Sequence, residues 1–288
     1  MRCLLLVVAL CPILSAQTFK STVDQVAIPV TIQSAANEPV RDLQPSDFRI
    51  FEDGRPVPIV AFGRFKQPLH VLLLLDTSRS MMQSLSEVTA AAEAVITQLS
   101  PDDSFQIGTF SNSLRMSPVF TADDMHVGTR LSLVPGANVT TLFDALVEGC
   151  AAFSGQGKRR AIFVVSDGTD TASSASARTV MQRAAEMNVS INAVGVAGRD
   201  TARGKPVSRA PDPVLREIAE DSGGVYVNAG TGRDFSQVFA RMIEELRREY
   251  MLGFTPARAD GRLHTIVVTT HRANVKIRAR KQYLAPLP

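Results

Sequence analysis

Apolar positions divide the chain into three zones with different periodicities. In residues 22–66, the apolar side chains from Val26 to Ile32 alternate with other residues, which is the period-two pattern of a half-buried strand. Residues 47–52 alternate again, and Asp53-Gly54 follows them as a hairpin turn signal. A further strand is expected at 59–65. This first zone therefore predicts short strands joined by turns.

Residues 69–248 predict strands that alternate with helices. A continuous apolar run at 70–75 ends at Asp76, which is typical of a strand buried on both faces. Further strands are expected at 105–110, 161–165, 189–196 and 225–227, and helices at 84–99, 123–133, 142–153, 175–187, 213–221 and 234–248. This order favours a doubly wound α/β sheet. In such sheets the ligand crevice lies at the carboxyl ends of the strands, where Asp76 and Asp167 both stand.

The last zone, residues 249–284, returns to β patterning, with strands expected at 250–254, 265–270 and 275–279. Neither β zone has enough strands to bury a face by itself. We therefore predict that the 22–66 and 249–284 segments pair in one small, sandwich-like β unit, with the 69–248 domain inserted between them. The polar, basic segment 199–211 is expected to be a loop.

The first residues predict export. Residues 1–16 have a basic start, a short apolar run and Ala16 at a plausible cleavage site, which is the pattern of a signal peptide. The run is too short to span a bilayer as a permanent helix, and no later segment is apolar enough to do so. The expected location is periplasmic, cell-surface or extracellular. A lipoprotein signal ending at Cys11 is the alternative, although bulky Leu10 precedes that cysteine. Without these residues, Cys150 is the remaining cysteine, expected as a small buried thiol.

Composition argues against a nucleic-acid partner. The 288 residues include 31 basic and 28 acidic side chains, for a net charge of +3, so a concentrated basic face is not indicated. The absence of Trp and the presence of only three Tyr leave little aromatic surface on which bases would stack.

Three polar segments at predicted strand ends carry the candidate chemistry. Asp76-Thr77-Ser78-Arg79-Ser80 follows the first buried strand and offers one carboxylate and two hydroxyls at alternate positions. The second segment is Ser166-Asp167-Gly168, and the third is the turn and helix start at 138–146. Such hard oxygen donors suit Mg²⁺, Mn²⁺ or Ca²⁺ better than zinc or copper.

Together these segments resemble the metal-ion-dependent adhesion site of von Willebrand factor A (VWFA) domains. The family pattern is Asp-x-Ser-x-Ser, a later Thr, and a later Asp that is usually followed by Gly. The positions that match the pattern are Asp76, Ser78, Ser80, Thr140 and Asp167. Thr140 is preferred to Thr141 because the family Thr stands four residues before an Asp, here Asp144; Asn138-Val139 replaces the usual Gly-Gly, so the choice of Thr stays open.

The resemblance implies a Rossmann-like VWFA domain at 69–248 that holds a divalent cation, Mg²⁺ with Mn²⁺ or Ca²⁺ as alternatives. It also implies a protein partner that presents an Asp or Glu carboxylate to the cation. Asp144 is a candidate for supporting the ligands, and Asp170 is expected to be a solvated loop acid. The segments 40–54, 250–254 and 280–283 look like a bacterial secreted family of VWFA-related domain proteins, which implies export and no known reaction.

Other interpretations remain open. Ser and Asp are common helix caps, so each segment alone is a weak signal. A Mg²⁺-dependent phosphohydrolase is the main enzymatic rival, but the dehalogenase-like pattern needs a second Asp where Ser78 stands. The sequence has no Gly-x-Ser-x-Gly elbow and no Gly-rich dinucleotide turn. A structural component of an envelope assembly is the other alternative to a non-catalytic binding protein.

Overall fold

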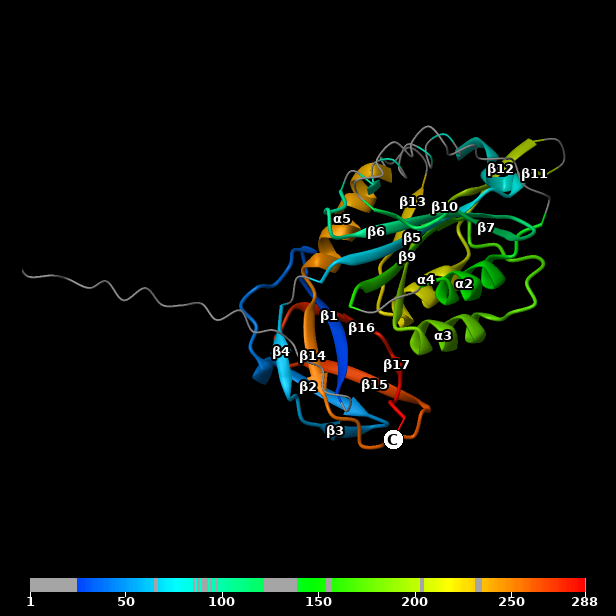
Figure 1. Ribbon diagram of the computed structural model, residues 1–288. Helices are drawn as coiled ribbons and strands as arrows, with labels where there is room; N and C mark the ends of the chain where they lie inside the picture. The colour runs from blue at the N-terminus through cyan, green and yellow to red at the C-terminus, as the bar shows by residue number, and fades with distance from the viewer. Residues whose placement is uncertain are drawn as a thin grey trace, which may run out of the picture.

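The computed structural model describes residues 25–64, 67–84, 86, 89, 93, 95–96, 98–121, 139–153, 157–202, 205–230 and 235–287. The expected signal peptide at 1–16 and the expected helix at 123–133 lie outside these residues. The chain forms an α/β domain and a smaller β unit, which are seen in Figure 1 above and below the middle of the view.

The α/β domain is built on one mixed sheet. Its strand order is β13-β10-β9-β5-β6-β7, and β8 also pairs with β6. The first five strands of this order are parallel, whereas β7 and β8 run antiparallel to β6. The strands are β5 (Leu69–Asp76), β6 (Ser104–Phe110), β7 (Leu114–Met116), β8 (Phe120–Thr121), β9 (Arg159–Ser166), β10 (Val189–Val196) and β13 (Tyr226–Gly230).

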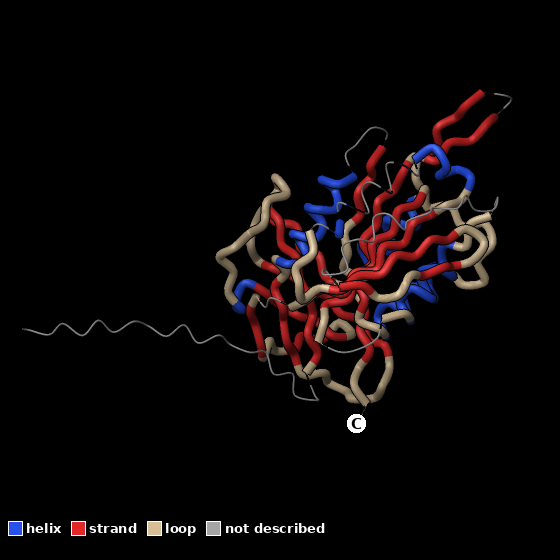
Figure 2. Tube along the Cα trace, turned by 45° about the horizontal axis from the view of Figure 1, so that its top comes forward, coloured by secondary structure: helices blue, strands red, loops and turns tan. Residues whose placement is uncertain are grey.

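Helices cover both faces of this sheet (Figures 1 and 2). Leu72 and Leu74 of β5 pack towards the side of α2 (Leu142–Ala151), α3 (Ala177–Glu186) and α4 (Pro213–Asp221). Leu73 and its neighbours on the other face pack towards α5 (Phe235–Arg247). Because every residue of β5 and β10 is buried, their apolar runs mark strands in a sheet covered on both sides. The predicted doubly wound α/β architecture is confirmed.

The β unit consists of two antiparallel sheets that share one core. One sheet has the order β16-β1-β14-β4 and the other β17-β15-β2-β3, so each combines strands from both ends of the chain, as predicted. The turn at Asp53-Gly54 has φ of 47° and 77°, as expected for a tight hairpin. The elements are β1 (Val26–Ser34), the 3₁₀ helix η1 (Pro45–Asp47), β2 (Phe48–Glu52), β3 (Arg55–Val57), β4 (Ala61–Gly63), β14 (Tyr250–Phe254), β15 (Leu263–Thr270), β16 (Val275–Ala279) and β17 (Gln282–Leu284).

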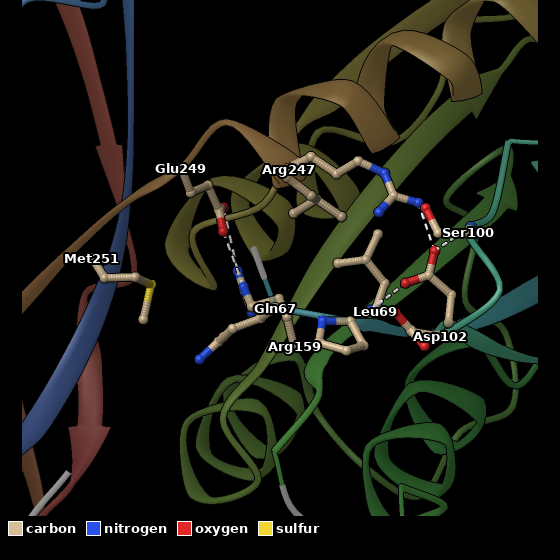
Figure 3. Close-up of a pocket in the computed structure, with 11 residues that line it drawn as sticks. Gln67, Leu69, Ser100, Asp102, Arg159, Arg247, Glu249 and Met251 are labelled. Atoms are coloured by element: carbon tan, nitrogen blue, oxygen red, sulfur yellow. Dashed lines mark hydrogen bonds and ion pairs between the residues drawn. The ribbon is translucent and has the colours of Figure 1, made fainter. Parts of the chain in front are cut away.

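The chain leaves the β unit after β4, forms the α/β domain and re-enters the β unit at β14. These strands are antiparallel neighbours, with Gly63 opposite Met251. Close to this junction lies a cavity of about 290 Å³ (Figure 3). Two ion pairs line it: Arg159 Nε to Glu249 Oε2 at 3.0 Å and Arg247 Nη2 to Asp103 Oδ2 at 2.6 Å. The cavity therefore lies at the amino-terminal edge of β5, at the opposite edge of the sheet from Asp76.

The prediction of a loop at 199–211 is wrong for most of this segment. Residues 198–209 form an antiparallel hairpin of β11 (Gly198–Ala202) and β12 (Lys205–Arg209), which projects from the domain in Figure 2. Its backbone pairing needs no alternation of apolar residues, so the sequence pattern carried no strand signal. No helix in the described ranges is both long enough and apolar enough to cross a bilayer.

Candidate metal centre

Asp76 ends β5 and turns the chain out of the sheet. Its side chain is fully buried, and its Oδ1 accepts a hydrogen bond from the backbone N–H of Ser78 at 2.8 Å. The 3₁₀ helix η2 (Arg79–Ser84) begins directly after this turn. The turn brings the Ser78 and Ser80 hydroxyl oxygens within 3.2 Å of each other. Both predicted serine ligands thus belong to one compact turn.

The second segment lies beside the first because β9 is the parallel neighbour of β5, with Leu75 opposite Val165. Ser166 Oγ donates to Asp76 Oδ2 at 2.6 Å and accepts from the Gly168 N–H at 3.0 Å. Ser166, which is not among the site residues predicted from the sequence, joins the two aspartate loops. The signal was its position, directly after a buried strand and directly before Asp167.

Asp167 is buried, and its Oδ1 accepts from the Thr169 N–H at 2.9 Å. Its Oδ2 makes no hydrogen bond within the described part of the chain. Gly168 has φ of 80°, and a Cβ there would lie 3.1 Å from the Asp212 backbone nitrogen. That nitrogen donates to the Asp167 carbonyl oxygen at 2.9 Å, while the Asp212 side chain caps α4. Glycine therefore allows the loop to pass close to the start of α4.

Thr140 precedes α2 and is tied to the loop that follows Asp167. Its carbonyl oxygen accepts from the Thr171 N–H at 2.9 Å, and its N–H donates to Thr171 Oγ1 at 2.9 Å. The Thr140 hydroxyl makes no hydrogen bond to any described residue, although the residue is only 5% exposed. The neighbouring Thr141 hydroxyl donates to the Ser111 carbonyl oxygen at 3.0 Å. Of the two threonines, Thr140 has the hydroxyl that remains available.

The end of β6 holds the first and third segments in place. The Phe110 carbonyl oxygen accepts from both the N–H and the hydroxyl of Thr77, at 2.9 and 3.1 Å. The next carbonyl oxygen, that of Ser111, accepts from the N–H and hydroxyl of Thr141, at 2.7 and 3.0 Å. The three sequence segments therefore meet around the carboxyl ends of β5, β6 and β9.

Two further acids organise the loop after β9. Asp144 accepts from the N–H groups of Ser174 and Ala175, at 2.9 and 2.8 Å. Asp170 accepts from the Ser173 hydroxyl at 2.6 Å and from the Phe143 N–H at 3.4 Å, at the start of α2. The expectation that Asp170 is merely a solvated loop acid is wrong, because its carboxylate fastens this loop to α2.

Burial leaves Asp76 in an electrostatically unfavourable position. The pKa of Asp76 is raised to about 6, chiefly by desolvation, and the negative charge of Asp167 acts in the same direction. The hydrogen bonds from Ser166 and Ser78 act in the opposite direction but are outweighed. Two buried carboxylates at one edge are unfavourable without a positive charge. The arrangement is thus suited to a cation.

Residues 70–241 match the family model described as von Willebrand factor type A domain. The fold and the arrangement of the loops agree with this match. The chain belongs to this family, which confirms the resemblance seen in the sequence.

Several solved structures share the fold. BatB from Bacteroides thetaiotaomicron is 21% identical with a TM-score of 0.53, over 62% of this chain and 98% of that one. An aerotolerance-related membrane protein from Bacteroides fragilis is 19% identical with a TM-score of 0.52, over 62% and 99%. Proximal thread matrix protein 1 from the mussel byssus is 14% identical with a TM-score of 0.51, over 68% and 51%. A comparison with curated proteins found no match.

Proposed function

We propose that this chain is a non-catalytic binding module in which a divalent cation captures a carboxylate of a protein partner. The proposed ligands are Asp76, Ser78, Ser80, Thr140 and Asp167. The observation that carries the proposal is the meeting of three separate sequence segments around buried Asp76. At that place Thr140 and Asp167 retain oxygen atoms that no described residue engages.

The spacing of the serine hydroxyls fits a hard cation. Adjacent ligands of an octahedral Mg²⁺, each about 2.1 Å from the ion, are about 3.0 Å apart. The Ser78 and Ser80 oxygens are 3.2 Å apart, close to this value. Two carboxylates and three hydroxyls form an all-oxygen donor set. We therefore infer Mg²⁺, with Mn²⁺ or Ca²⁺ as alternatives.

The charges of the ligands explain why the cation would take up a partner's carboxylate. Three of the five ligands are neutral hydroxyls, so the ion keeps part of its positive charge. Both oxygens of Asp76 already accept hydrogen bonds, whereas Asp167 Oδ2 accepts none from a described residue. We assign the direct carboxylate contact to Asp167 and a water-mediated contact to Asp76. An incoming Asp or Glu side chain completes the coordination, and the surrounding surface supplies specificity.

Export is part of the proposal, because residues 1–16 have the pattern of a signal peptide. A structural envelope component is the second candidate, in which the cation only braces the loops. The two differ in ligand exchange: a binding module keeps one exchangeable position on the ion, and a structural site does not.

Titration of the purified protein with MnCl₂, followed by calorimetry, tests the metal site. Wild type is expected to bind one Mn²⁺, while Asp76→Ala and Asp167→Ala lose this binding and keep the fold, because Asp76 is the last residue of β5 and Asp167 directly follows β9, both at the edge of the sheet. Asp102→Asn removes one charge from the opposite edge and is the matched control. Equal Mn²⁺ binding by wild type and both alanine variants would refute the ligand set.

Partner capture is tested by pull-down with Mg²⁺ and with chelator, using the same variants. A partner retained only with Mg²⁺, and lost from Asp167→Ala, supports the binding module. Metal binding with no exchangeable water and no metal-dependent partner favours the structural role. Turnover of p-nitrophenyl phosphate that disappears in Asp76→Ala would overturn the non-catalytic assignment.

A further inference from the structure

Arg280 is a half-buried cation without an acidic partner in the described part of the chain. It follows β16, where the β unit meets the α/β domain. Its Nη1 donates to Asn188 Oδ1 at 2.6 Å and its Nη2 to the Ala27 carbonyl oxygen at 3.0 Å, and both acceptors are neutral. Its Nε is buried and has no acceptor among the described residues. Charges that are withdrawn from water are normally paired with an opposite charge, so an anion is the group that would complete the contacts of Arg280.

Burial and repulsion by Arg159 both disfavour the positive charge of Arg280 and lower its pKa to about 9. Tyr283 acts in the opposite direction and raises this pKa. The surroundings of this guanidinium thus favour a negative ligand.

Arg280 lines a cleft of about 460 Å³ between the β unit and the α/β domain. Among the described residues that line it, four are basic and one, Glu220, is acidic. The basic residues are Lys276, Arg278, Arg280 and Lys281. Arg278 donates through Nη2 to Glu245 at 2.8 Å, yet its Nε is also buried without an acceptor. The volume falls within the range of about 300–1,000 Å³ that is usual for ligand sites.

The walls of the cleft favour a peptide over a simple inorganic anion. β16 is the edge strand of its sheet. Within the described ranges, no backbone hydrogen bond reaches the outer edge of β16 between Val275 and Ala279. Val267, which is 54% exposed, adds apolar surface to the lining. Free strand edges pair with extended peptides, and flanking side chains select the sequence.

We propose that this cleft binds an acidic peptide segment in an extended conformation, with one of its carboxylates paired to Arg280. The site is distinct from the metal centre. Asn188, which contacts Arg280, directly precedes β10 at the amino-terminal edge of the sheet, whereas Asp76 and Asp167 lie at the carboxyl edge. In Figure 1, β16 lies on the side of the β unit that faces α3 and α4.

Fluorescence anisotropy with a labelled peptide of alternating Glu and Val residues tests this proposal, in chelator so that the metal centre does not contribute. Wild type is expected to bind it saturably and more weakly at high salt. Arg280→Met should weaken binding at least about tenfold, because one charge-assisted hydrogen-bonded pair is lost. Lys276→Gln removes an exposed charge, with an expected loss of about two- to fivefold.

Arg258→Gln is the matched control, because Arg258 is an exposed basic residue of the β unit outside the cleft and should leave binding unchanged. Thermal unfolding of Arg280→Met checks its fold, and Lys276→Gln provides the test if that variant is unstable. Three results would overturn the proposal: unchanged affinity in both cleft variants, equal binding of a Lys-Val peptide, or displacement of the peptide by inorganic phosphate at similar concentration.

Discussion

Thr140 and Thr141 are neighbours with opposite expected roles, which gives a sharp test of the metal centre. In Thr141→Val the hydroxyl bond to the Ser111 carbonyl is lost, although that carbonyl still accepts from the Thr141 N–H at 2.7 Å. The acceptor is not orphaned, so the expected loss is about 1 kcal/mol. For a domain of this size this corresponds to a decrease in Tm of about 2–4 °C. Mg²⁺ binding should persist.

Thr140→Val should leave the stability in chelator nearly unchanged and remove most of the stabilisation by Mg²⁺. Its hydroxyl makes no hydrogen bond to a described residue, so the free energy of unfolding in chelator is expected to change by less than about 0.5 kcal/mol. One metal ligand is removed, however. At a Mg²⁺ concentration of about 100 times Kd, binding stabilises the wild-type fold by about 2.7 kcal/mol, and most of this increment should vanish.

Thermal unfolding of wild type and both variants, each with chelator and with Mg²⁺, measures the two effects in one experiment. Loss of the Mg²⁺ increment in Thr141→Val, with retention in Thr140→Val, would show that the threonines are assigned in the wrong order. Equal increments in all three proteins would remove threonine from the ligand set.

Three further changes test other parts of the structure. Glu249→Leu leaves buried Arg159 without its partner, so chemical denaturation should show a free energy of unfolding lower by about 3–5 kcal/mol. A double variant that also carries Arg159→Met should recover most of this stability. Gly168→Ala places an alanine at a left-handed φ of 80°, with its Cβ against Asp212. Calorimetry should therefore show a decrease of about 1–2 kcal/mol in the free energy of unfolding and weaker Mn²⁺ binding. The hydrogen bonds that His264 donates to Asp53 and Asp260 raise its pKa, so the stabilisation by these bonds is complete below pH 6.5 and lost as pH rises through the raised pKa. His264→Gln should flatten this part of a Tm-against-pH curve, and an unchanged curve would exclude the effect.

The architecture of the α/β domain was predictable because buried parallel strands leave a strong sequence signal. The run before Asp76 has apolar residues on both faces of the strand, and the strands β9 and β10 leave similar buried runs. The pairing of the two β zones followed from the need of short strands to bury a face. The division of consecutive β15 and β16 between different sheets depends on tertiary packing, which local alternation does not encode.

At the candidate centre, the sequence pattern identified the aspartates and hydroxyls but not what holds them. The choice between Thr140 and Thr141 depends on the Ser111 carbonyl oxygen, a backbone group without a sequence signature. Ser166 and Asp170 act through contacts with residues far along the chain. Their types and positions are ordinary for a turn, so only the folded arrangement reveals their roles. The metal ligands themselves stay predictions.

The α/β domain is inserted into the β unit between two paired strands, β4 and β14. Because Gly63 stands directly opposite Met251 in an antiparallel pair, the whole α/β domain occupies the position of an oversized hairpin loop. Two opposite residues of such a pair have Cα atoms only about 4.5–5.5 Å apart, a gap that a turn of a few residues closes. Excising the domain and inserting such a turn should therefore yield a self-contained sandwich, and the same gap would accept a different guest domain whose ends lie close together.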